Sequence, residues 1–250
     1  MMSAWFFLQQ TESNKILYIL DDGNSFTGNY EQDNIYLECV AERFPTLPNK
    51  YNYMITRAKE LFNPDIFIVW ENDDWFFPWH IDSYLKAYVA YNADFVHADF
   101  VFSADYHGIS KQYTRRTHYH GSLSYRASIT SMPFYPETYK MAFDLMLIDR
   151  LNKNYRRCVP ISKTPSYCWF HANPELPSGS LLPDRNLPND NWYLTASRVR
   201  QEAEKHTFKP QLYQNYVTII NKLLPGSIDV ERGVWNIEAL AVGLDKIGGK

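Results

Sequence analysis

The sequence predicts an α/β fold in which a mainly parallel sheet is covered by helices on both faces. Residues 16–20 and 66–70 are unbroken apolar runs, a pattern typical of strands buried on both faces. Helical patterns alternate with these runs, at residues 50–62 and after Pro78. Strands that alternate with helices along a chain form a parallel sheet between helical layers.

The other predicted elements fit the same class. The further helices are residues 2–10, residues 136–151 and two segments near 192–206 and 212–223. The further strands are residues 35–40, 95–102 and 167–170. Residues 172–190 are rich in Pro, Asn and Ser, which predicts a loop or linker.

Composition indicates one large domain, or one domain with an extension. The chain has 250 residues, 45% of them hydrophobic and 21% charged, which is enough for a sizeable core. Its net charge of −3 gives no reason to expect the whole surface to bind nucleic acid or anionic membranes. Three cysteines without metal-ligand spacing, no basic leader and no long apolar run predict a cytoplasmic protein with free thiols and no membrane span.

Both buried runs end in acidic clusters. Glu71-Asn72-Asp73-Asp74 follows the second run, and its carboxylates repel one another unless a cation or a helix N-terminus compensates. Hard cations such as Mg²⁺ and Mn²⁺ take oxygen ligands of this kind. The alternative is a solvated turn that caps the helix after Pro78.

Asp21-Asp22-Gly23 follows the first run. A carboxylate there could accept hydrogen bonds from a nucleotide base or a ribose hydroxyl, and the alternative is an ordinary Asp-Gly turn. Ligands of parallel sheets bind beyond the carboxyl ends of the strands. The coincidence of two acidic strand ends therefore indicates a ligand site.

Four motifs carry a resemblance to a known family. They are, in order, Gln9-Gln10-Thr11, Asp21-Asp22-Gly23-Asn24-Ser25, Lys50-Tyr51-Asn52, and Trp70-Glu71-Asn72-Asp73-Asp74-Trp75 with Pro78. In order, spacing and strand context, residues 5–105 resemble the nucleotide-binding half of the large inverting glycosyltransferase family with the GT-A fold (glycosyltransferase family 2-like). The resemblance implies a glycosyltransferase that uses a nucleotide-diphosphate sugar.

The resemblance also implies roles for single residues. Asp21 and Asp22 match the positions that contact base and ribose, and Lys50 and Asn52 match the basic residue and the Asn near the diphosphate. Glu71-Asn72-Asp73 matches the metal-binding D-x-D motif, with Glu71 in place of the first Asp.

The metal that the resemblance implies is Mn²⁺ or Mg²⁺. Asp73 matches its direct ligand, and Glu71 contacts ribose or metal. Residues 166–173 resemble the family's late strand that ends in H-G-x-N, so His171 could complete the metal site or touch the diphosphate.

The second half of the chain carries the expected catalytic base. Residues 121–126 resemble the segment before the acceptor site, and residues 134–151 resemble the part where members carry E-D before a helical R-L. In that alignment Asp144 matches the second acid, and Phe143 stands where Glu is common. An inverting transferase needs a base to deprotonate the acceptor hydroxyl. Asp144 is the candidate, with Asp149 or Asp74 as alternatives.

The resemblance divides the chain into three parts. Residues 1–105 form the nucleotide-sugar-binding half, residues 106–190 the acceptor and catalytic half of the same domain, and residues 191–250 a helical C-terminal extension. Family members begin with a strand of the form V-S-V-I-I-P-T-Y-N, and this chain starts at about the helix that follows it. We therefore expect the first family strand to be absent, or its sheet position to be filled by another segment.

The sequence leaves the identity of the acceptor open, and it could be a glycan, a protein or a modified nucleic acid. One basic and aromatic stretch could bind a polyanionic acceptor, and the alternative is a solvated hairpin. It contains Lys111, Tyr113, Arg115, Arg116, His118, Tyr119, His120, Tyr125 and Arg126.

Two other functions remain open. A nucleotidyltransferase also uses metal-bound carboxylates after strands, but the Gly-rich basic loop usual near its N-terminus is missing from this sequence. A catalytically impaired GT-A-like protein that binds a carbohydrate or a nucleotide would account for the missing first strand and for Glu71 and Phe143.

Overall fold

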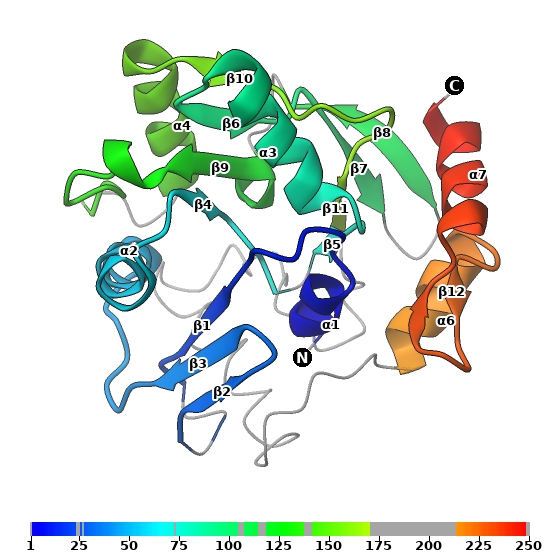
Figure 1. Cartoon of the computed structure of the whole chain (residues 1–250), viewed down its shortest axis with the longest axis horizontal. Helices are drawn as coiled ribbons and strands as arrows, with labels where there is room; N and C mark the ends of the chain where they lie inside the picture. Colours follow the sequence, from blue (N-terminus) through cyan, green and yellow to red (C-terminus); the bar gives the residue numbers. More distant parts are fainter. Residues whose placement is uncertain are drawn as a thin grey trace, which may run out of the picture.

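The computed structural model has an α/β architecture with six helices and mixed sheets in its described residues (Figure 1). These are residues 2–23, 26, 28–72, 74–104, 108–114, 119–137, 142–170 and 214–248.

The N-terminal part forms a small sheet of its own. After α1 (Met2–Leu8), β1 (Leu17–Asp21) pairs in parallel with β3 (Ile35–Cys39), and β2 (Tyr30–Gln32) pairs antiparallel to β3, in the order β1-β3-β2. The apolar run predicted from the sequence is β1. Its side chains pack with those of α1 and β3 in one buried cluster, so this sheet is held to the first helix by apolar contacts.

Helix α2 (Leu47–Phe62) packs beside this sheet. The hydroxyl of Thr46 accepts a hydrogen bond from the Asn49 N–H at 3.3 Å, and a proline lies in the first turn, so both starting signals of a helix are present. Asn63 ends the helix in the left-handed conformation.

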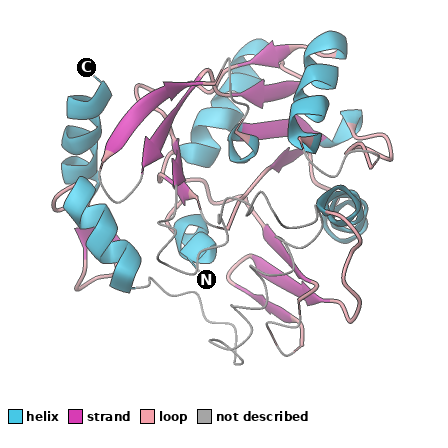
Figure 2. Ribbon diagram, turned by 180° about the vertical axis from the view of Figure 1, so that it is seen from behind, coloured by secondary structure: helices cyan, strands magenta, loops and turns pink. Residues whose placement is uncertain are grey.

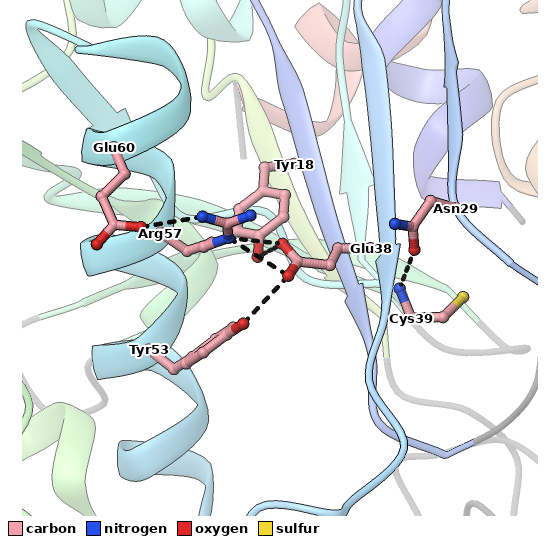
Figure 3. Close-up of polar contacts among 7 residues, drawn as sticks. All are labelled: Tyr18, Asn29, Glu38, Cys39, Tyr53, Arg57 and Glu60. Carbon is pink, nitrogen blue, oxygen red and sulfur yellow. Dashed lines mark hydrogen bonds and ion pairs between the residues drawn. The ribbon is translucent and has the colours of Figure 1, made fainter.

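A polar cluster joins α2 to the sheet (Figure 3). The buried carboxylate of Glu38 on β3 accepts hydrogen bonds from Tyr18 at 2.8 Å and Tyr53 at 3.1 Å, and it faces the guanidinium of Arg57 at 3.4 Å. Burial, and then the hydrogen bond to Glu38, raise the pKa of Tyr18. The phenol therefore stays neutral and donates to the carboxylate.

A second sheet has helices on both faces. Its order is β10-β6-β9-β4, and its strands are β4 (Ile66–Ile68), β6 (Phe95–His97), β9 (Leu123–Arg126) and β10 (Arg157–Cys158). On one face Phe95 packs with α4 (Phe143–Asn154), and on the other Val96 packs with α3 (His80–Tyr91). Neighbouring residues of one strand thus serve opposite faces, as the pleat requires. Figure 2 shows this sheet and the small N-terminal sheet as separate arrays.

A third sheet connects the C-terminal part to the core. Its order is β5-β11-β7-β8, and its strands are β5 (Trp75–Phe76), β7 (Phe100–Ala104), β8 (Ile109–Tyr113) and β11 (Tyr167–Phe170). The C-terminal elements are α6 (Gln214–Leu223), β12 (Ile228–Asp229), β13 (Val234–Trp235) and α7 (Ile237–Gly248). They share a buried cluster with α1 and the third sheet, and the Trp5 indole donates to the Gly233 carbonyl at 2.9 Å.

The α/β class is confirmed, but the prediction of a mainly parallel central sheet is wrong. The described strands form separate sheets, and the second and third of these are mixed because β9 runs antiparallel between β6 and β4, and β8 runs antiparallel beside β7. In the part of the chain that the structure describes, no strand pairs with the second edge of β1 or of β4.

Several element boundaries also differ from the prediction. The strand expected over residues 95–102 is two strands, β6 and β7, in different sheets. The helix expected from residue 136 begins at Phe143. The C-terminal helix predicted near 212–223 is α6, whereas the predicted helix near 192–206 and the linker 172–190 lie outside the described residues.

Within the described ranges, none of the helices has the length and apolar character that crossing a bilayer would require. The three cysteines are free thiols.

Candidate functional site

One turn of α2 connects three of the predicted site segments. Lys50 contacts Asp22 after β1, and Tyr51 contacts Glu71 after β4. Asn52 binds the backbone of Tyr135. These segments are distant in the sequence, and α2 brings them to one place. The five residues predicted to hold the nucleotide are therefore gathered around this turn.

Asp21 stabilises the loop that follows β1 through two hydrogen bonds. Its Oδ1 accepts from the Gly23 N–H at 3.0 Å and its Oδ2 from the Phe26 N–H at 2.9 Å. The side chain is buried. Both oxygens thus shape the turn, so a nucleotide contact by Asp21 would have to coexist with these bonds.

Asp22 and Lys50 form a buried ion pair. The Nζ of Lys50 lies 2.7 Å from Oδ1 of Asp22, and the two side chains are 17% and 3% exposed. The other carboxylate oxygen accepts from the Phe44 N–H at 3.2 Å. The ammonium has three donors, so Lys50 can keep Asp22 and still bind another anionic group.

Glu71 lies in a hydrogen-bonded chain. Its Oε1 accepts from Tyr51 at 3.2 Å and contacts Nδ1 of His120 at 2.5 Å. Nε2 of His120 lies 2.8 Å from the Tyr135 hydroxyl, which lies 3.4 Å from the Tyr125 hydroxyl. One imidazole therefore links the predicted metal or ribose residue to two buried phenols.

The protonation states follow from burial and charge. Burial alone would raise the pKa of Glu71, but the hydrogen bond and charge interaction with His120, together with the hydrogen bond from Tyr51, hold that pKa below its ordinary value. Burial, followed by its Tyr125, Tyr51 and Glu71 neighbours, raises the pKa of Tyr135 well above the ordinary value. Glu71 is thus an ionised carboxylate that only accepts, and Nδ1 of His120 carries the proton that it receives.

Aromatic rings surround the hydrogen-bonded chain that begins at Glu71. The Tyr51 ring stacks on Tyr135 with centroids 4.9 Å apart, and Phe143 contacts Tyr51 at 5.9 Å and His120 at 5.6 Å. Phe143 begins α4, so its neighbour Asp144, the predicted base, lies in the first turn of that helix and is half-buried. The alternative base Asp149 lies further along α4 and is exposed.

Asn52 joins α2 to the segment before Pro136. Its Nδ2 donates to the Tyr135 carbonyl and to Oε1 of Glu137, both at 2.9 Å, and its Oδ1 accepts from the Tyr135 N–H at 2.7 Å. The side chain is 7% exposed. Asn52 thus satisfies the buried backbone of Tyr135 and fixes the phenol that contacts His120.

Asp74 connects the loop after β4 to the end of β11. Its buried carboxylate accepts from the Tyr167 hydroxyl and, at 3.1 Å, from the Phe170 N–H. To act as the alternative base, Asp74 would have to leave these partners. Phe170 directly precedes His171, a predicted metal residue that lies outside the described residues.

Glu71 is the described member of the predicted metal-ligand set. Asp73 and His171 lie outside the described residues, and the described part of the chain contains no group of three His, Cys, Asp or Glu side chains arranged to hold a metal. Both hydrogen bonds of Glu71 engage Oε1, and its side chain is 26% exposed. A partly exposed, ionised carboxylate oxygen is a donor that suits Mg²⁺ or Mn²⁺.

Sequence reasoning missed the pairing of His120 with Glu71. His120 was grouped with the basic and aromatic stretch, whose described members lie in different surroundings. Lys111 on β8 lies over the Phe100 ring at 4.4 Å, and Arg126 donates to the Ala93 carbonyl at 2.7 Å. No spacing rule relates an acid after one strand to a histidine 49 residues later.

Neither the family models nor the curated proteins compared with this chain gave a match.

Proposed function

We propose that this chain is a metal-dependent glycosyltransferase of the GT-A fold, which moves a sugar from a nucleotide-diphosphate donor to a hydroxyl acceptor with inversion. The observation that carries the proposal is the convergence of the Asp22, Glu71 and Tyr135 segments on residues 50–52. The resemblance assigned Asp22 and Glu71 to the donor site and the Tyr135 segment to the acceptor half, and these segments meet at one turn of α2. The free thiols are in keeping with a cytoplasmic location.

In this proposal the donor lies against the turn of α2. The ammonium of Lys50 attracts the diphosphate while Asp22 holds its position. Glu71, with Asp73 and His171, would hold Mn²⁺ or Mg²⁺. When bound, the ion neutralises negative charge on the leaving diphosphate.

His120 and Tyr51 position Glu71. Both reach Oε1, so the direction of the second oxygen is fixed before a ligand binds. Asp144, beside the aromatic rings around Glu71, takes the proton of the acceptor hydroxyl. Its half-buried side chain lies in the first turn of α4.

The test is a thermal-shift screen with nucleoside diphosphates and nucleotide sugars, each with and without Mn²⁺. Ligands that bind only the folded state raise its melting temperature. We expect a Mn²⁺-dependent rise with one nucleotide, lost in Lys50→Gln and kept in the charge-matched control Lys86→Gln on α3. Lys86 pairs with Asp82 four residues earlier, away from the turn of α2.

The pairing of Glu71 with His120 supports a second candidate, a nucleotide- or carbohydrate-binding protein without catalysis. A carboxylate already engaged on one oxygen has less freedom to hold a metal. Slow hydrolysis of the nucleotide sugar in the presence of Mn²⁺ separates the two functions. An enzyme hydrolyses it and loses this activity in Glu71→Gln, whereas a binding protein retains the thermal shift without hydrolysis.

A further inference from the structure

An open pocket lies between α2 and residues of the segment 132–137. Its volume is about 440 Å³, within the range of small-ligand sites. The lining residues are Asn49, Asn52, Tyr53, Thr56, Met132, Pro133 and Glu137. The first four lie along one side of α2, with the spacing of successive helical turns.

The chemistry of the lining selects the ligand. Among the described residues that line the pocket, Glu137 is the one charged group, and it is negative. Lys59, further along α2, donates to the Thr130 carbonyl at 3.0 Å and does not line the pocket. The described lining therefore offers no positive charge to an anionic ligand such as a diphosphate, in contrast to the Lys50 side of the same helix.

The polar groups suit a hydroxyl-rich ligand. The Asn49 Nδ2 group can donate while its Oδ1 accepts from the Thr46 hydroxyl at 2.6 Å. The Thr56 hydroxyl can accept while donating to the Asn52 carbonyl at 3.1 Å, and the Glu137 carboxylate can accept. Met132 and Pro133 add apolar surface. A sugar ring offers this combination, because its hydroxyls lie around the rim and its C–H groups form apolar faces.

Two of the lining side chains, Asn52 and Tyr53, are ordered by hydrogen bonds before a ligand binds. Asn52 is buried and bonds Oε1 of Glu137 at 2.9 Å, which leaves the second carboxylate oxygen for a ligand. The Tyr53 hydroxyl donates to Glu38 at 3.1 Å, and its ring lies 5.0 Å from that of Phe44. Side chains that are already ordered lower the entropic cost of binding.

We propose that this pocket binds an uncharged sugar ring and, resting on the proposed transferase function, that this sugar belongs to the acceptor. Asn52 connects the two places, since it lines the pocket and bonds the backbone of Tyr135, whose hydroxyl contacts the His120 imidazole beside Glu71. The acceptor class is therefore a neutral glycan rather than a polyanion.

The binding test uses saturation-transfer NMR with the methyl glycosides of glucose, galactose and mannose. Thr56→Phe places a ring in the pocket from an exposed helical position, and Leu61→Phe adds the same side chain to α2 outside the lining. We expect transfer to at least one glycoside in the wild type and in Leu61→Phe, and no transfer in Thr56→Phe. Absence of transfer to all three glycosides, or equal transfer in Thr56→Phe, overturns the proposal.

A second variant tests the carboxylate. Glu137→Gln keeps the shape and removes the charge, and since hydrogen bonds to charged groups are about twice as strong as neutral ones, we expect roughly tenfold weaker glycoside binding. Unchanged affinity contradicts the role of Glu137.

Thr56→Phe is expected to retain the Mn²⁺-dependent thermal shift with nucleotide.

The two proposals fail separately. A protein that shows the nucleotide shift but binds no glycoside overturns the sugar pocket and leaves the donor site standing. A protein that binds a glycoside in this pocket but no nucleotide overturns the transferase function and retains the pocket.

Discussion

Replacing Asn52 with alanine is expected to destabilise the fold by about 2–4 kcal/mol. The wild-type amide makes two bonds to the backbone of Tyr135, a residue with 0% exposure, and a third to the exposed Glu137. Each internal bond contributes about 1 kcal/mol, and a buried group left without a partner costs about 1–3 kcal/mol. The bond to Glu137 adds little because water replaces it.

Urea unfolding followed by tryptophan fluorescence measures this loss. The midpoint should fall while the slope of free energy against urea stays the same, because the surface exposed on unfolding does not change. Asn154→Ala is the matched control, since that amide bonds the Arg150 carbonyl at 2.8 Å in an exposed position; its effect should stay below about 0.5 kcal/mol. A loss under about 1 kcal/mol in Asn52→Ala would refute the structural role, since it would mean that Tyr135 does not depend on this amide.

Three further outcomes are expected. Burial lowers the pKa of His80 to about 3 from 6.5, so below pH 6.5 the unfolded chain binds a proton that the folded chain does not, and stability falls with acid down to about pH 3. From pH 7 to pH 5 wild type should lose about 2 kcal/mol more than His80→Gln in urea unfolding. Gly121→Ala places a Cβ 2.7 Å from the Tyr167 ring and should cost about 1–3 kcal/mol in thermal unfolding, whereas Gly108→Ala, with nothing within 4 Å, should be near neutral. Glu38→Gln weakens three hydrogen-bonded contacts and should lower the unfolding midpoint by about 1–3 kcal/mol; an unchanged midpoint would contradict that cluster's role.

Local patterns predicted the elements that depend on neighbouring residues. The apolar run before Asp21 forms most of β1, in keeping with the continuous apolar pattern of a buried strand, although Ile16 lies outside the strand and is exposed. Helix α2 was predicted over residues 50–62, and it begins three residues earlier because Thr46 caps it. Such signals lie within a few residues of the element that they control.

Features set by distant residues could not be predicted in this way. Residues 95–102 look like one strand, yet the chain breaks between β6 and β7 near Asp99. The Asp99 carboxylate bonds Arg157 at 2.5 Å and its carbonyl accepts from the Thr114 N–H at 2.9 Å. Both partners are remote in the sequence. The pairing of Glu71 with His120 is non-local in the same sense, since it depends on where β9 enters the second sheet.

The geometry of α2 explains why one short motif serves several segments. Successive helical residues point about 100° apart, so residues 50–52 face three directions and reach three segments from one turn. The same three side chains therefore support both the fold and the proposed site. Loss of activity in Asn52→Ala would not by itself assign that residue to the nucleotide, because the variant also releases Tyr135 and with it the support of His120. Lys50→Gln is the more direct probe of the donor, since its partner Asp22 remains held by the Phe44 N–H.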